Sequence, residues 1–208
     1  NVGIHADAVL EGDGGKIIVW ADDTTRYFGS LFARGGSNQG NGGLAEVSGK
    51  ENLLFRGKAD LVATNGKRGT LLLDPKNIQV ADSPNCGSSC DGTSGNAGDV
   101  TTGATFSGNS IVARGDDFGI RTSDLVSALT SDVILKANND ITIDSAIDSS
   151  GNNDGGSLEL QAGRSIDINA NITVEGSFTA IANDDSASGS FRDSGHATIN
   201  SNGFTINT

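Results

Sequence analysis

A pattern of apolar residues occurs twice in the second half of the sequence, at a separation of 25 positions. The matched positions are Val133 and Leu158, Leu135 and Leu160, Ala137 and Ala162, Ile141 and Ile166, Ile143 and Ile168, and Ile147 and Ile172. Two further copies follow, the first with Phe178, Ala180 and Ala182, the second with Ile199, Phe204 and Ile206. Self-similarity at such a period is typical of solenoids and other repeat proteins, so it restricts the fold more than any other feature.

Within each copy, apolar and polar residues alternate, which is the periodicity of a β-strand with one buried face. Asn, Gly, Asp and Ser separate the short strands, and these residue types favour turns. One such unit buries too little apolar surface by itself. Stacked units bury that surface against one another and pair strand to strand. The repeat therefore predicts an all-β fold, a parallel β-helix (solenoid).

A second version of the repeat fills the first third of the chain, where Gly14–Gly36 is echoed by Gly42–Gly66. At separations of 28 to 30 positions the matches are Ile17 and Val19 with Ala45 and Val47, Tyr27 and Gly29 with Phe55 and Gly57, and Ala33 with Ala63. We expect these apolar residues to point inward, together with Leu31, Ala59 and Leu61. A corner is predicted at Asp74-Pro75, because proline has no N–H to donate to a strand ladder.

The middle of the chain, residues 82–130, interrupts the pattern. Most of it is predicted to be a long Gly/Ser loop, with a short helix over residues 123–130 at its end. Ser123 is the expected N-cap, and Leu125 and Leu129 share one helix face. We expect one domain over residues 1–208, with about eight coils at the usual strand spacing of ~4.8 Å.

Charge and composition exclude several functions. The net charge of −12 disfavours contact with nucleic-acid phosphates. No stretch approaches the ~18 apolar residues of a membrane span, and no signal peptide is visible at the start of the chain. Cys86 and Cys90 lie four positions apart in a Gly/Ser-rich stretch, which favours a small disulfide over two free thiols or a zinc site.

Several long phrases resemble the filamentous-haemagglutinin-type exoproteins of two-partner secretion. They are "GGKIIVWADDTTRYFGSLFARGG", "NGGLAEVSGKENLLFRG", "GTLLLDPKNI", "ILKANNDITI" and "LELQAGRSIDINANI", in this order. The resemblance covers Gly12–Ala81 and Thr122–Asp184, whereas the cysteine loop has no counterpart. It implies a right-handed parallel β-helix that is exported through a dedicated outer-membrane partner. The secretion module of the family is not found, so we expect a passenger or stalk segment of a longer protein.

Trp20 is the one candidate for ligand binding. If Ile17 and Val19 point inward, Trp20 points outward, where its indole either stacks on a sugar ring or is covered by the 82–130 segment. Phe28, Phe32 and Val62 point outward on the same register, which favours the covered patch.

Acidic pairs are interpreted as turn residues and not as a metal site or a catalytic dyad. They are Asp22-Asp23, Asp116-Asp117 and Asp184-Asp185. A polysaccharide lyase needs carboxylates and an arginine within hydrogen-bond reach. Arg26, Arg34 and Arg56 with Asp60 form a loose candidate group, and a solvated outer face is favoured over it. His5 and His196 lie near opposite ends of the sequence, with nothing nearby that makes a triad or a metal pair, and both are interpreted as surface residues.

The sequence therefore predicts a non-catalytic structural or adhesive stalk of a large secreted bacterial surface protein, without cofactor or metal. Its expected partners are the outer-membrane transporter and glycans or proteins of a host cell or matrix. A carbohydrate-binding module on a β-helix is the first alternative. A polysaccharide lyase or hydrolase is the second.

Overall fold

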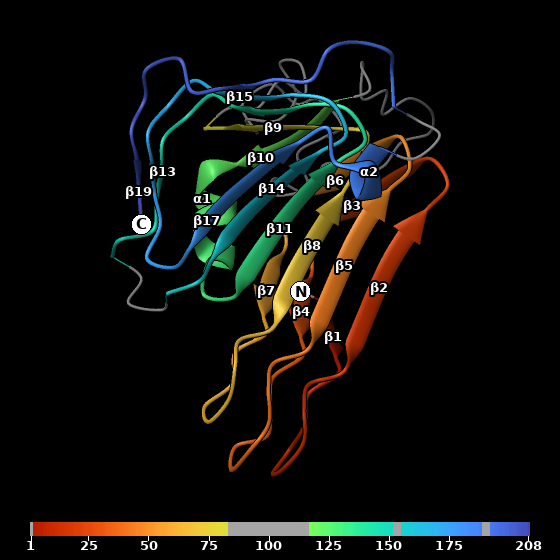
Figure 1. Cartoon of the computed structure of the whole chain (residues 1–208). Helices are drawn as coiled ribbons and strands as arrows, with labels where there is room; N and C mark the ends of the chain where they lie inside the picture. The colour runs from red at the N-terminus through yellow and green to blue at the C-terminus, as the bar shows by residue number, and fades with distance from the viewer. Residues whose placement is uncertain (1, 83–116, 152–154, 189–191) are drawn as a thin grey trace.

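The computed structural model describes residues 2–82, 117–151, 155–188 and 192–208, and within them the chain is a parallel β-helix (Figure 1). Every strand pairing in these ranges is parallel. The all-β solenoid predicted from the repeat is therefore confirmed.

One side of the solenoid is a six-stranded sheet, whose strands lie side by side in Figure 1 in the order β17-β14-β11-β8-β5-β2. Its members are β2 (Lys16–Ala21), β5 (Leu44–Gly49), β8 (Thr70–Asp74), β11 (Asp132–Ala137), β14 (Leu158–Ala162) and β17 (Phe178–Ala182). Within the described ranges, these six strands correspond to six coils on this side, where about eight were expected for the chain.

A second side is a seven-stranded sheet in the order β18-β15-β12-β9-β10-β6-β3. Its members are β3 (Thr24–Tyr27), β6 (Asn52–Phe55), β9 (Asn77–Ala81), β10 (Asp117–Arg121), β12 (Ile141–Ile143), β15 (Ile166–Ile168) and β18 (Ile199–Asn200). This sheet has one strand more than its neighbour because β10 is inserted between β9 and β6.

The third side consists of two three-stranded sheets with a helix between them. One is β1 (Gly3–His5), β4 (Ser30–Phe32) and β7 (Lys58–Asp60), and the other is β13 (Ile147–Asp148), β16 (Ile172–Thr173) and β19 (Ile206–Asn207). Helix α1 (Thr122–Ala128) contacts both β7 and β13. It occupies the place of a strand in the third coil.

This third coil corrects two predictions about residues 82–130. The segment was interpreted as a loop as far as the helix, but Asp117–Arg121 is a strand. The helix forms within about two residues of the predicted range, yet Ser123 does not cap it. The N-cap is Arg121, without a side-chain cap hydrogen bond. Residues 83–116 lie outside the described ranges.

The register of the second half is confirmed at each of its predicted pairs. Val133 lies beside Leu158, Leu135 beside Leu160 and Ile147 beside Ile172. The third and fourth copies continue the same rows, through Ala180, Ile199 and Ile206 among others.

In the first half, Ile17, Val19 and Tyr27 also find their predicted partners. The match of Ala33 with Ala63 is wrong. The separation stays at 28 positions through β4 and β7, and the Ala33 N–H binds the Asp60 carbonyl, which places Ala33 beside Leu61.

The core is a continuous stack of inward-facing aliphatic side chains. Leu71, Leu73, Leu135 and Leu160 are all fully buried. Phe55 is fully buried too, and its ring lies parallel to that of Tyr27 at 6.0 Å. A fully buried leucine contributes about 1.5–3 kcal/mol relative to an exposed one, so the stack is the main source of stability.

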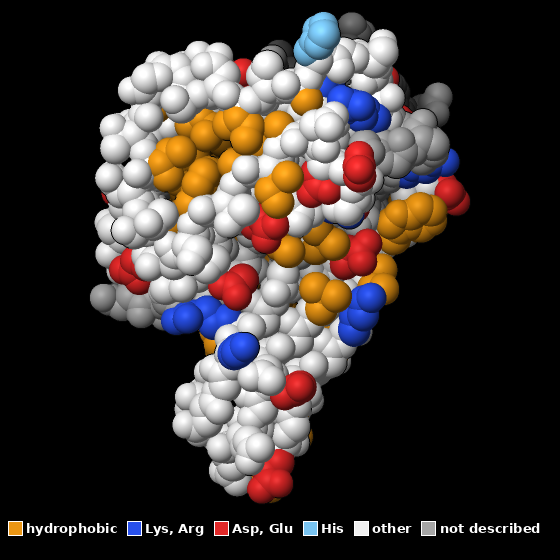
Figure 2. All heavy atoms as spheres, in the orientation of Figure 1, with side chains coloured by type: hydrophobic (Ala, Val, Ile, Leu, Met, Phe, Trp, Pro, Cys, Tyr) orange, Lys and Arg blue, Asp and Glu red, His pale blue; other side chains and the backbone are white. Residues whose placement is uncertain are grey.

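Three long turns stack beyond the body of the solenoid as a narrow projection (Figures 1 and 2). They precede β2, β5 and β8, at residues 6–15, 33–43 and 61–69. Gly42 shows why they are rich in glycine: a Cβ at this position would lie 1.8 Å from the Leu61 carbonyl oxygen. Backbone packed this closely leaves no room for a side chain.

The last coil leaves apolar side chains exposed, and Figure 2 shows hydrophobic side chains gathered in this part of the molecule. The exposed residues in its strands and turns are Ile181, Ile199, Phe204 and Ile206. A one-turn helix, α2 (Asp185–Ser188), follows β17 and was not predicted from the sequence.

Candidate functional site

The outer surface of the six-stranded sheet carries the candidate site. Alternation along β2 turns Ile17 inward, at 5 % exposure, and leaves Ile18 and Trp20 outward, each at 55 %. The strand register then places Trp20 of β2 beside Ser48 of β5, and Ser48 beside Asp74 of β8. Three successive coils therefore contribute one outward row of an aromatic, a hydroxyl and a carboxylate.

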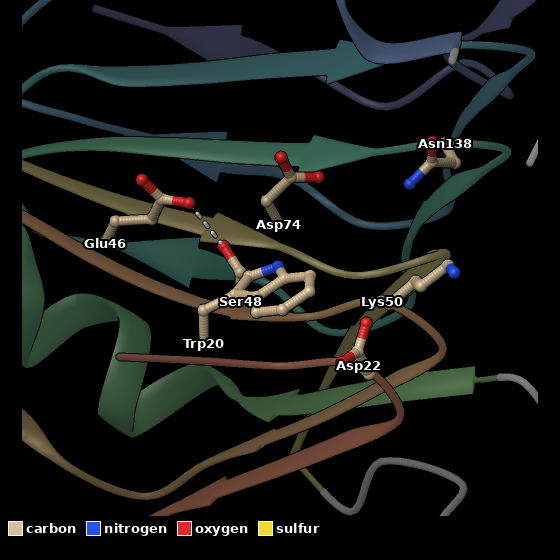
Figure 3. Close-up of a pocket in the computed structure, with 7 residues that line it drawn as sticks. All are labelled: Trp20, Asp22, Glu46, Ser48, Lys50, Asp74 and Asn138. Atoms are coloured by element: carbon tan, nitrogen blue, oxygen red, sulfur yellow. Dashed lines mark hydrogen bonds between the residues drawn. The ribbon is translucent and has the colours of Figure 1, made fainter. Parts of the chain in front are cut away.

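A groove of about 370 Å³ lies over this row (Figure 3). Its lining residues are Trp20, Asp22, Glu46, Ser48, Lys50, Asp74 and Asn138. Figure 3 shows the indole near Ser48, the hydrogen bond from Ser48 to Glu46, and the Asp74 side chain on the next strand. Asp22, Lys50 and Asn138 come from the turns that follow β2, β5 and β11. The strands thus supply the floor of the groove, and the turns supply its polar end.

The Asp74 carboxylate is the electrostatic centre of the groove. Burial raises the pKa of Asp74 to about 6, with a smaller increase from Glu46, while the charge of Lys136 acts in the opposite direction. Glu46 itself accepts a hydrogen bond from the Ser48 hydroxyl at 2.9 Å. Within the described ranges, no group donates a hydrogen bond to the Asp74 side chain. Asp74 therefore has unused acceptor capacity in a partly dehydrated place.

Trp20 lies apart from Phe32, with which the outward register grouped it. Its side chain is 55 % exposed in the six-stranded sheet, whereas Phe32 lies in β4 on the third side of the solenoid. The turn at Asp22-Asp23 separates these sides, which a linear alternation does not take into account. Residues 83–116, most of the segment expected to cover Trp20, lie outside the described ranges, so the cover and the stacking on a sugar ring both stay predictions.

A second polar group lies beside β1 and β4. The His5 ring stacks on Phe32 at 4.4 Å between centroids, and its Nδ1 lies 3.0 Å from the Asp7 carboxylate. Asp7 also accepts a hydrogen bond from the Arg34 backbone N–H at 2.8 Å. The Arg34 side chain forms an ion pair with Asp60. His5 is exposed, as expected of a surface histidine, and has the neighbours described above.

This second group does not have the charges of an acid–base pair. Burial raises the pKa of Asp7, but the hydrogen bonds from Arg34 and His5 outweigh it and hold the pKa below its usual value. The hydrogen bond to Asp60 raises the pKa of the Arg34 guanidinium. The hydrogen bonds from His5 and Arg34 thus favour the ionised form of Asp7, and the Arg34–Asp60 ion pair links successive coils. Such ion pairs stabilise the stack only modestly, because they are partly exposed.

The loose group proposed for a lyase is not assembled. Arg34 is next to Asp60, but Arg26 lies in β3 of the seven-stranded sheet. Arg56 instead lowers the pKa of Asp124 in α1, against the larger effect of burial. Sequence reasoning missed Glu46 and Asp74 as neighbours of Trp20. The 28-residue separation places Ser48 beside Trp20, whereas the next coil is shorter and Asp74 lies 26 positions after Ser48.

Metal and disulfide predictions have little to test them. Among the residues that the structure describes, no three His, Cys, Asp or Glu side chains are placed to hold a metal ion. Cys86, Cys90 and Asp116 lie outside the described ranges, so the disulfide stays a prediction. His196 accepts a hydrogen bond at its backbone carbonyl from the Ser165 hydroxyl, at 3.3 Å.

No helix in the described part of the chain is both long and apolar enough to cross a membrane. Comparisons with protein-family models and with curated proteins found no match to the sequence.

Proposed function

We propose that the chain is a non-catalytic structural and adhesive stalk segment of a large secreted bacterial surface protein. The observation that carries this proposal is the unbroken stacking of coils, in which a row such as Leu73, Leu135 and Leu160 continues from strand to strand. A fold of this kind extends along one axis, because each coil contacts mainly its two neighbours. It can hold a distal part of a protein away from a cell.

The surface supports a location outside the cell. Its polarity comes from Asn, Ser, Thr and Gly with only 19 % charged residues, and the net charge of −12 disfavours nucleic-acid partners. Export through an outer-membrane two-partner-secretion transporter, and contact with host-cell or matrix glycans and proteins, follow from the resemblance of the repeat phrases. Both belong to the proposal.

A carbohydrate-binding module is the second candidate, because one observation favours it. Trp20 is half-exposed at a groove with polar neighbours, which is the arrangement that distinguishes such a module from a stalk without a ligand.

Labelling of whole cells tests the stalk proposal. Antibodies raised against the 208-residue chain are applied to intact and to permeabilised cells of the organism that makes it. We expect equal labelling of both, and loss of the label after mild external proteolysis. Labelling that requires permeabilisation would place the protein inside the cell and overturn the proposal.

A further inference from the structure

We propose that the groove beside Trp20 binds an uncharged pyranose unit of a glycan, with the sugar ring stacked on the indole and its hydroxyls held by Asp74 and Asn138. The inference rests on the second candidate function and is independent of the stalk proposal.

The indole supplies the apolar contact. Trp20 is a large aromatic side chain left 55 % exposed, fixed on a strand whose neighbour on the next coil carries the small Ser48. The face of a pyranose ring carries C–H groups, which pack on an aromatic face with release of water. Because the strand holds the backbone of Trp20, the platform needs little ordering when a ligand binds.

The polar groups supply hydrogen bonds that the protein itself does not make. Asp74 is partly buried, yet among the described residues its carboxylate receives no hydrogen bond, and the raised pKa reflects this poor solvation. A carboxylate in such a place gains a charge-assisted hydrogen bond when a donor approaches it. A sugar hydroxyl is such a donor. The Asn138 side chain adds both a donor and an acceptor at the other end of the groove.

Charge selects among sugars. Three carboxylates, from Asp22, Glu46 and Asp74, line the groove against the ammonium of Lys50, and the charge of Lys136 acts on Asp74 from the neighbouring strand, in a chain of net charge −12. A uronate or sialic acid would bring a further negative charge to this surface and is repelled. An uncharged hexose or N-acetylhexosamine unit is accepted. The volume of about 370 Å³ is near the lower end for ligand sites, so a short segment of a glycan fits.

Trp20 is the only tryptophan in the chain, so its fluorescence and its indole N–H resonance report on this groove directly. The folded 208-residue protein is titrated with cellotetraose, maltotetraose, N,N′,N″,N‴-tetraacetylchitotetraose and, as the anionic counterpart, tetragalacturonate. We expect saturable changes of both signals with at least one uncharged oligosaccharide and none with tetragalacturonate.

Variants assign the binding to the groove. By isothermal titration calorimetry, Trp20→Ala is expected to weaken the affinity for that oligosaccharide about tenfold or more, and Asp74→Asn about fivefold. Ile181→Ala is the matched control, because Ile181 is also outward and exposed on the same sheet but lies on β17 at its opposite edge. Its affinity is expected to equal that of the unchanged protein.

Three results would overturn the inference: no response to any uncharged oligosaccharide, equal binding of tetragalacturonate, or unchanged affinity of Trp20→Ala. If Trp20→Ala does not fold, the indole N–H shift of the unchanged protein and the Asp74→Asn affinity decide the question. A negative outcome leaves the whole-cell labelling result as it stands, so the two proposals fail separately.

Discussion

At the scale of single residues, Asp74 occupies a place where burial disfavours the negative charge of its own side chain. It ends β8 immediately before Pro75 and faces outward, where the charges of Glu46 and Lys136 act on its carboxylate in opposite directions. Burial raises its pKa from the ordinary value of 3.8 to about 6, so over this range the folded state holds a proton that the unfolded state releases. Between these values the native protein therefore loses stability as the pH rises.

Asp74→Asn removes this penalty. Each pKa unit corresponds to about 1.4 kcal/mol, and partial solvent access reduces the full effect, so we expect a gain of about 1–2 kcal/mol in the free energy of unfolding at pH 7.5. At pH 4 the native Asp74 is already neutral, and the gain should vanish. Urea denaturation at the two pH values measures both. The same gain at both values would show that the charge of Asp74 is not the cause.

The direction of each side chain was predictable where it depends only on alternation, as for Ile17 inward and Trp20 outward. The neighbours of Trp20 were not predictable, because they depend on which residues the neighbouring coils place in the same row. The pairing of Arg34 with Asp60, 26 positions away, has the same origin. Alternation has no information about such neighbours until the register is known.

At the scale of elements, the third coil shows the limit of pattern reasoning. The sequence "DFGIR" of β10 holds too few alternating residues to signal a strand, and it forms one between the edges of β9 and β6. Helix α1 was predictable because Leu125 and Leu129 are one turn apart, and both are buried. Its place between β7 and β13 follows from the solenoid and not from its own sequence.

If α1 replaces a strand in the wall of the solenoid, its apolar face must carry core energy. Leu125 is fully buried, so Leu125→Ala is expected to lower the free energy of unfolding by about 2–5 kcal/mol. Leu10→Ala makes the same chemical change at a side chain that is 62 % exposed and should cost less than about 0.5 kcal/mol. Denaturant midpoints compare the two. Equal, small effects would mean that α1 lies on the solenoid without being part of its core.

At the scale of the whole molecule, the fold was predictable because the same pattern of apolar residues occurs in successive coils. Leu135 alone predicts only a buried position, whereas Leu135 and Leu160 within matching phrases predict two stacked strands. Where the phrase changes, as at Ala33, the predicted separation increased from 28 to 30 positions, whereas the paired strands keep a separation of 28. An alignment of phrases can change the separation freely. In the folded chain, the same change would break backbone hydrogen bonds between strands, which costs free energy.

Along the solenoid, matching apolar residues of successive coils stack on one another, and contacts between methyl groups test this stacking most directly. Deuterated protein with protonated leucine and valine methyl groups is prepared, and nuclear Overhauser effects are recorded. The account predicts cross-peaks from Leu135 to Leu73 in the preceding coil and to Leu160 in the following one. The absence of both, with Leu135 contacting leucines of other rows instead, would contradict it.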